Sequence, residues 1–92
     1  MKILLTESFQ RDLSHLAPEN REVAVSTLLK IPRIIKDTHQ HQGVGLRKIH
    51  SSGIFEARIG LGLRMVFGYK EDTLILHRLG NHDEIRRYLK NL

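Results

Sequence analysis

The residues of this sequence that could carry chemistry are basic side chains and histidines in its second half. They are Arg47, Lys48, His50, Arg58, Arg64, Arg78 and His82. Arginine stabilises negative charge as it develops on phosphate oxygens. A histidine or a carboxylate can move the proton that such a reaction needs to transfer. If the fold brings these residues to one concave face, they are suited to phosphodiester chemistry.

Two of the arginines are expected to face each other across a β-hairpin. Residues 54–60 and 63–69 alternate apolar and polar side chains, which is the period of a half-buried strand. A short glycine-rich segment between them is typical of a tight turn. If that turn centres on Leu61, Arg58 lies directly opposite Arg64. Like charges in cross-strand contact are destabilising, which favours a role in binding phosphate.

The alternative is that each arginine is neutralised by its own carboxylate, for which Glu56 is the nearest candidate. Similar alternatives apply to two residues further along the chain. His82 could be a capping or loop histidine, and Tyr88 could be a core residue of the last helix. The sequence leaves these alternatives open.

The rest of the pattern predicts a single α+β domain over residues 1–92. An N-terminal strand and a helical hairpin pack on a small antiparallel sheet, and a C-terminal helix follows. The expected strands are 2–5, 46–49, 54–60, 63–69 and 73–79. The expected helices are 7–16, about 19–30, and a last one capped by Asn81 or Asp83.

The second helix carries two further expectations. Val25, Leu28 and Leu29 are predicted to form its buried stripe, with Val23 or Ala24 at the margin. Pro32 is predicted to end or bend it, because proline lacks a backbone N–H and its ring clashes with the preceding turn.

Composition narrows the classes of partner and of site. The net charge is +5 and the pI is near 10, which favours an acidic partner such as nucleic acid or an acidic protein. Aromatic residues make up only 5%, so a base-stacking platform of aromatic rings is not expected. The N-terminal apolar run is too short for a signal or membrane segment, and we expect a cytoplasmic protein with no membrane contact.

No metal or cofactor is expected. The sequence has no cysteine, so thiol chemistry and cysteine-based metal sites are excluded. His39 and His41 could be read as a pair of metal ligands, but no third ligand lies near them in the sequence and zinc sites use three or four. Polar loop residues are the better interpretation of both.

Taken in order, four segments of this chain resemble the RelE/ParE toxin superfamily of bacterial and archaeal toxin–antitoxin pairs. They are KILLTESFQRDL, FEARIGLGLRMVF, DTLILHRLG and NHDEIRRYL, and the resemblance spans nearly the whole chain. Its most specific parts are Arg58-Ile59-Gly60, Gly62-Leu63-Arg64 and the Gly-x-His-Asp-Glu run at 80–84. In the RelE branch, the resemblance implies an endoribonuclease that cuts messenger RNA, often in the ribosomal A site.

The resemblance also implies roles for individual residues. Arg64 matches a family catalytic arginine, Arg58 matches a basic position on the preceding strand, and His82 lies where members carry a catalytic arginine or histidine. We expect these three to be catalytic. Arg47, Lys48 and Arg78 are expected to bind RNA, and the further candidates are Glu56, Arg86 and Tyr88. Glu56 stands where some ribosome-dependent members have a lysine, and Arg86 where members with the His-Asp-Glu run have a tyrosine.

The expected partners follow from the same resemblance: a cognate antitoxin, in a hetero-oligomer, and messenger RNA with the ribosome. Other functions remain open, namely a ParE-like inhibitor that binds DNA gyrase without catalysis, a catalytically weak member, or a regulator that binds an antitoxin and DNA. The discriminating feature is whether the basic cluster lines a groove with His82 or is scattered over the surface.

Overall fold

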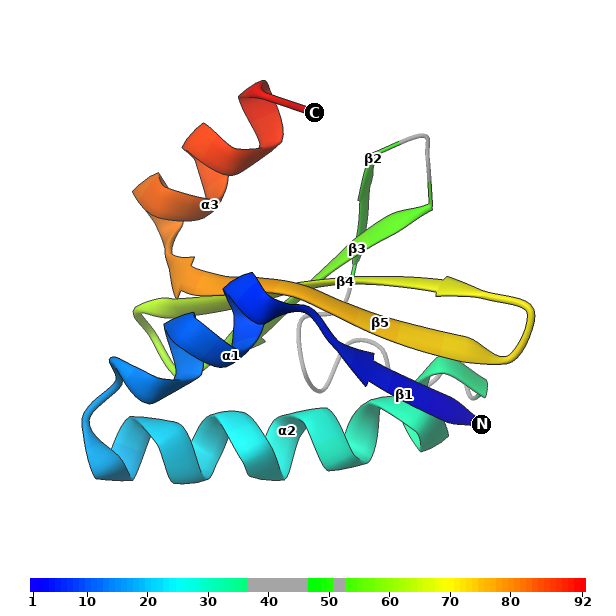
Figure 1. The fold of residues 1–92 in the computed structure, drawn as a ribbon, viewed down its shortest axis with the longest axis horizontal. Coiled ribbons are helices and arrows are strands. Elements are labelled where there is room, and N and C mark those ends of the chain that lie inside the picture. Colours follow the sequence, from blue (N-terminus) through cyan, green and yellow to red (C-terminus); the bar gives the residue numbers. More distant parts are fainter. Residues whose placement is uncertain (37–46, 51–52) are drawn as a thin grey trace.

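The computed structural model describes residues 1–36, 47–50 and 53–92, and its strands form one five-stranded sheet. The strands are β1 (Lys2–Leu5), β2 (Arg47–His50), β3 (Ile54–Ile59), β4 (Leu63–Lys70) and β5 (Thr73–Asn81). They lie in the order β1-β5-β4-β3-β2 (Figure 1). β2 to β5 form the predicted antiparallel meander, and β1 joins its edge by parallel pairing with β5.

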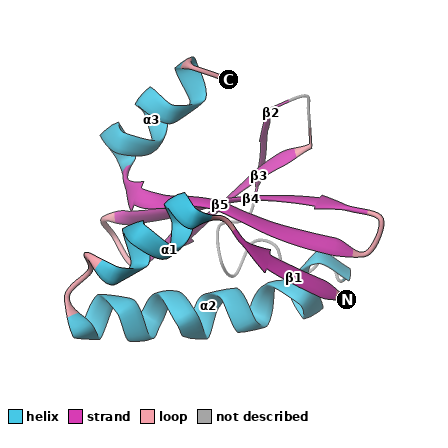
Figure 2. Ribbon diagram, viewed as in Figure 1, coloured by secondary structure: helices cyan, strands magenta, loops and turns pink. Residues whose placement is uncertain are grey.

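The helices of the described residues are α1 (Glu7–Ser14), α2 (Pro18–Lys36) and α3 (His82–Lys90). Thr6 caps α1, because its side chain accepts a hydrogen bond from the backbone N–H of Phe9 at 3.0 Å. α1 and α2 form the predicted helical hairpin on one side of the sheet, and α3 rises on the other side from the end of β5 (Figure 2). The predicted α+β class is confirmed. None of the described helices is both long and apolar enough to cross a membrane.

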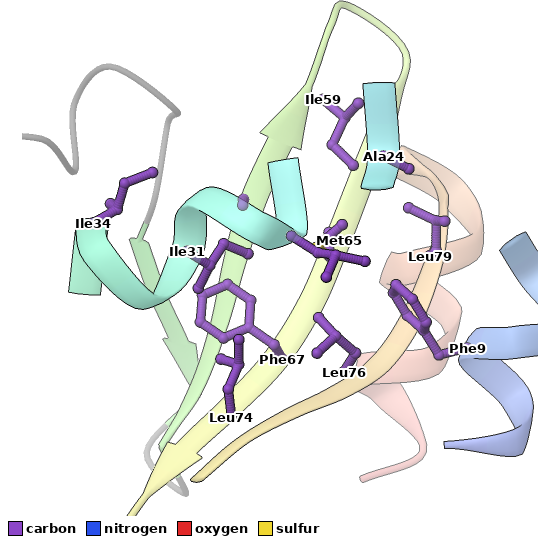
Figure 3. Packing of buried hydrophobic residues seen from close by; sticks show 12 residues of the cluster. Phe9, Ala24, Ile31, Ile34, Ile59, Met65, Phe67, Leu74, Leu76 and Leu79 are labelled. Atoms are coloured by element: carbon purple, nitrogen blue, oxygen red, sulfur yellow. The ribbon is translucent and has the colours of Figure 1, made fainter. Parts of the chain in front are cut away.

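The main core lies between the helical hairpin and the sheet (Figure 3). Phe9 of α1, Ile31 of α2 and Met65 and Phe67 of β4 are fully buried. Each such apolar side chain contributes about 1.5–3 kcal/mol by leaving water. The alternation of a strand sends every second residue to one face, so this core fixes which side chains of β3 and β4 point away from it.

The prediction that α2 ends near residue 30 is wrong, because α2 continues through Pro32 to Lys36. A proline inside a helix costs about 3 kcal/mol or more. Ile31 and Ile34, on either side of it, are 0% and 4% exposed. Their burial continues the contact of α2 with the core beyond the proline and offsets that cost.

The predicted buried stripe of α2 is also partly wrong. Leu28 is buried, but Val25 and Leu29 are 37% and 66% exposed. The stripe that meets the core runs through Ala24, Leu28 and Ile31, at spacings of four and three residues. Val25 and Leu29 consequently form part of an apolar outer surface.

The second face of the sheet carries a smaller buried layer. Val66 of β4 and Ile85 of α3 are 0% and 3% exposed, yet neither belongs to the main cluster. α3 therefore covers part of this face. Glu56, Arg58 and Arg64 also alternate with core residues and belong to the face beneath α3.

Candidate active site

The register of the β3–β4 hairpin is the predicted one. Ile59 pairs with Leu63 and Arg58 pairs with Arg64, so the two arginines are direct cross-strand neighbours. Gly60 opens the turn with a φ of +61°, a conformation that favours glycine. Arg58 is exposed, and within the described part of the chain no carboxylate lies at ion-pair distance from it.

Glu56 lies on β3 two residues before Arg58, and its carboxylate is buried on the same face. It is 5% exposed, and its Oε1 atom lies 3.5 Å from the Nε atom of Arg64. Arg64 also donates from Nη1 to the backbone oxygen of Leu63 at 3.2 Å. The alternative in which a carboxylate neutralises the arginine is therefore correct for Arg64. Among the described residues no carboxylate does the same for Arg58, and the exposed charge of Arg58 can meet a ligand.

The start of α3 is fixed by a reciprocal cap. The Asn81 side chain accepts a hydrogen bond from the N–H of Glu84 at 2.8 Å, and the Glu84 carboxylate accepts from the N–H of Asn81 at 3.0 Å. The prediction that Asn81 or Asp83 caps this helix is confirmed with Asn81. His82 is the first helical residue and its side chain is exposed.

A groove of about 360 Å³ lies between α3 and strands β2 and β3. On the helical side, its lining residues are spaced at i, i+3, i+4 and i+7, which places them on one face of α3. They are His82, Ile85, Arg86 and Leu89. On the sheet side, the lining residues are Lys48, Ile49 and Glu56. The groove thus combines aliphatic walls, two cations, a carboxylate and an imidazole.

The structure therefore brings together several of the predicted site residues. Lys48, Glu56, His82 and Arg86 line one groove. Arg64 reaches it through its ion pair with Glu56, and Arg58 lies next to Arg64. The sequence was also consistent with Arg86 as a solvated residue of the helix surface, and Arg86 is indeed exposed while it lines the groove. Its spacing of four residues from His82 was the signal in the sequence that the two share a face.

Arg78 and Tyr88 do not line this groove; they contact each other instead. The guanidinium carbon of Arg78 lies 5.7 Å from the centroid of the Tyr88 ring. Arg78 also donates two hydrogen bonds to Asp12 of α1, and this interaction raises the pKa of Arg78 above its ordinary value. Sequence reasoning attached no function to Asp12, which is 66 residues away in the chain.

Other candidates lie partly or wholly outside what the structure describes. The backbone of Arg47 pairs with Glu56, but its side chain and that of His50 fall outside the described residues. His39 and His41, the alternative metal pair, also fall outside them. Among the described residues, no three metal-ligating side chains of the histidine, aspartate or glutamate type gather at one point.

Several solved structures resemble this chain over nearly its whole length. A copper-bound mutant toxin from Helicobacter pylori is 26% identical with a TM-score of 0.69, over 92% of this chain and 98% of that one. A chain of the RelB–RelE antitoxin–toxin complex from Methanococcus jannaschii is 20% identical with a TM-score of 0.66, over 92% and 96%. YafQ from E. coli is 16% identical with a TM-score of 0.69, over 91% and 96%.

These similarities define the class of the protein at the level of its fold. The chain has the RelE-like fold, as the resemblance in its sequence predicted. No family model and no curated protein matches the sequence itself. The fold and the groove are thus the basis for assigning a function.

Proposed function

We propose that this chain is the toxin of a type II toxin–antitoxin system and cleaves messenger RNA without a metal ion. The observation that carries the proposal is the groove in which Lys48, Glu56, His82 and Arg86 meet, with Arg64 joined to it through Glu56. The groove holds groups that can transfer a proton next to groups that stabilise negative charge. RNA cleavage through the ribose 2′-hydroxyl needs both.

In this proposal the 2′-oxygen forms a bond to the adjacent phosphorus, and the bond from phosphorus to the 5′-oxygen breaks. Glu56 accepts the proton of the 2′-hydroxyl, and His82 donates a proton to the leaving 5′-oxygen. Arg58 and Arg64 stabilise the charge that develops on the phosphate oxygens. Lys48 and Arg86 hold the RNA backbone at the mouth of the groove.

The proposed partners are an acidic antitoxin and messenger RNA on the ribosome, in the cytoplasm. The matched Methanococcus jannaschii chain comes from a complex with the antitoxin RelB, and an intact RelBE complex from E. coli also matches, at 13% identity. A net charge of +5 favours both an acidic protein and RNA. The RNA-binding roles of Arg47 and Arg78 and the role of Tyr88 stay predictions.

The test is primer extension on a message translated in a cell-free system with the purified protein. We expect new 5′ ends with the native chain, and a loss of about a hundredfold or more in cleavage with Arg64→Ala, equivalent to about 3 kcal/mol. Arg86→Ala and Arg87→Ala are a matched pair on α3, since Arg86 lines the groove and Arg87 does not. Only Arg86→Ala should reduce cleavage strongly.

Two outcomes would count against this function. Undiminished cleavage by a correctly folded Arg64→Ala variant would remove the arginine from the mechanism. An intact message with the native chain would favour the ParE-like alternative, gyrase inhibition by binding, which a supercoiling assay tests directly. Repeating the assay on naked RNA decides whether the ribosome is required.

A further inference from the structure

The edge of β5 is completed by two different elements. β1 pairs with it only as far as Leu5 opposite Leu76. Beyond that point the cap of α1 and α1 itself follow, and the hydroxyl of the cap residue Thr6 donates to the backbone oxygen of His77 at 3.0 Å. The carboxylate of Asp12 then accepts the backbone N–H of Leu79 at 2.9 Å. The side chains of Thr6 and Asp12 thus replace a neighbouring strand.

Asp12 receives more than this backbone bond. Its Oδ2 atom accepts from Nε of Arg78 at 2.8 Å, and its Oδ1 atom accepts from Nη2 at 3.2 Å. The Asp12 side chain is 16% exposed and the Arg78 side chain 35% exposed. A two-pronged pair of this kind fixes the plane of the guanidinium as well as its position.

The orientation of Arg78 matters because Tyr88 lies against it. The contact of 5.7 Å between the guanidinium and the ring joins β5 to the second half of α3. α3 has few other anchors among its described side chains: the cap at Asn81, the buried Ile85 and the half-buried Leu89. Arg86 and Leu89, on the groove, flank Tyr88 in the sequence.

We propose that Asp12 is a positioning residue for the groove. Through Arg78 it holds Tyr88, and through Tyr88 it sets where the second half of α3 lies, so that Arg86 and Leu89 stay at the groove wall. The effect on α3 is independent of what the groove does, whereas the effect on cleavage rests on the proposed function.

The test compares amide hydrogen exchange of α3 in the native chain and in variants. Asp12→Asn keeps one oxygen for the N–H of Leu79 but loses the charged pair with Arg78. We expect residues 86–90 to exchange about tenfold faster in this variant and in Tyr88→Ala, while β4 keeps its protection. Tyr88→Phe retains the ring and should leave the exchange unchanged. Glu7→Gln removes an exposed charge from the same helix and is the matched control.

The combination of the two substitutions separates positioning from general loss of stability. If Asp12 acts through Arg78 and Tyr88, the double variant Asp12→Asn with Tyr88→Ala exchanges no faster in α3 than either single variant. The proposal would be overturned if the two substitutions raised the exchange rate of α3 additively. It would also be overturned if α3 exchanged in Asp12→Asn at the rate of the native chain. Cleavage by the native chain is read in parallel. Faster α3 exchange in a protein that cuts no RNA would support the positioning role and reject the proposed function.

Discussion

The side-by-side arginines at 58 and 64 are an arrangement that folding alone does not favour. Arg64 is neutralised by Glu56, whereas Arg58 is exposed and has no carboxylate at ion-pair distance among the residues that the structure describes. Directly opposed like charges weaken a strand pair by about 0.2–1 kcal/mol. A bound phosphate would reverse the sign of that contribution.

This leads to a prediction in which stability and activity change in opposite directions. Arg58→Thr removes the repulsion and introduces a residue with high strand propensity, so we expect a gain of about 0.5 kcal/mol in unfolding free energy. The same variant should lose RNA cleavage. Thermal unfolding and the primer-extension assay measure the two effects.

Arg58→Lys is the control for this prediction, because it keeps the charge in place. It should resemble the native chain in stability and retain part of the activity. A lower unfolding free energy in Arg58→Thr would show that Arg58 has a structural role that the described contacts do not include.

The hairpin was also the best-predicted element of the chain. Alternation of apolar residues with Glu56, Arg58 and Arg64 and a turn rich in glycine fix the register, and both signals are local. The buried face of α2 was not predictable in the same way. Leu29 is more apolar than Ala24, yet Ala24 is buried and Leu29 exposed. The packing of the sheet against α2 decides which of the two side chains is buried. The sequence of the helix alone does not show which of its faces meets the sheet.

α3 as an element supplies one whole wall of the groove, and the residue before its cap is a glycine for a visible reason. A Cβ atom placed on Gly80 would lie 3.1 Å from Oε1 of Glu84 and 3.2 Å from its Cβ atom. Glu84 makes half of the cap that starts α3. Gly80 therefore leaves room for the side chain that caps α3, the helix that His82 begins.

We predict that Gly80→Ala destabilises the protein by about 1 kcal/mol through loss of the cap. The midpoint of thermal unfolding should fall by about 4–8 °C, and cleavage should fall further than stability alone explains, because His82 begins the same helix. Gly62→Ala is the matched control, since nothing lies within 4 Å of a Cβ atom at that position. Equal losses of stability in Gly80→Ala and Gly62→Ala would contradict the role of Gly80 in making room for the cap.

At the scale of the whole molecule, a half-buried histidine links stability to pH. His77 lies in β5, and its Nε2 atom is 3.2 Å from the place that a Cβ atom would occupy on Gly68. Burial lowers the pKa of His77 below its ordinary value of 6.5. The unfolded chain therefore binds this proton at a higher pH than the folded chain, and protonation favours unfolding.

We accordingly predict lower stability in weak acid. The stabilisation from neutral His77 is complete above pH 6.5 and is lost as the pH falls from there through the folded pKa. Thermal unfolding at a pH above and a pH below this value should show the drop. His77→Gln cannot take up the proton, so its drop should be smaller. The same drop in both proteins would assign it to other groups.

The candidate site was predictable in its residue types but not in its arrangement. Arg78 and His82 are four residues apart, yet Arg78 contacts α1 and Tyr88, while His82 lines the groove. Arg78 belongs to β5 and His82 to α3. Only the packing of α3 on the sheet shows that one side chain lies at α1 and the other at the groove. The contribution of Asp12 depends on contacts between segments far apart in the sequence.

The parallel pairing of β1 with β5 delays the completion of the sheet during synthesis. Thr6 and His77 are 71 residues apart, and ribosomes that add about 5–20 residues per second need roughly 4–14 s to make that stretch. During those seconds Ile3, Leu4 and Leu5 have been made but their strand partner has not. The segment that carries His82 and Arg86 is synthesised later still. A chain that has not yet reached Leu89 therefore contains no complete groove, and the protein cannot act before α3 has been made.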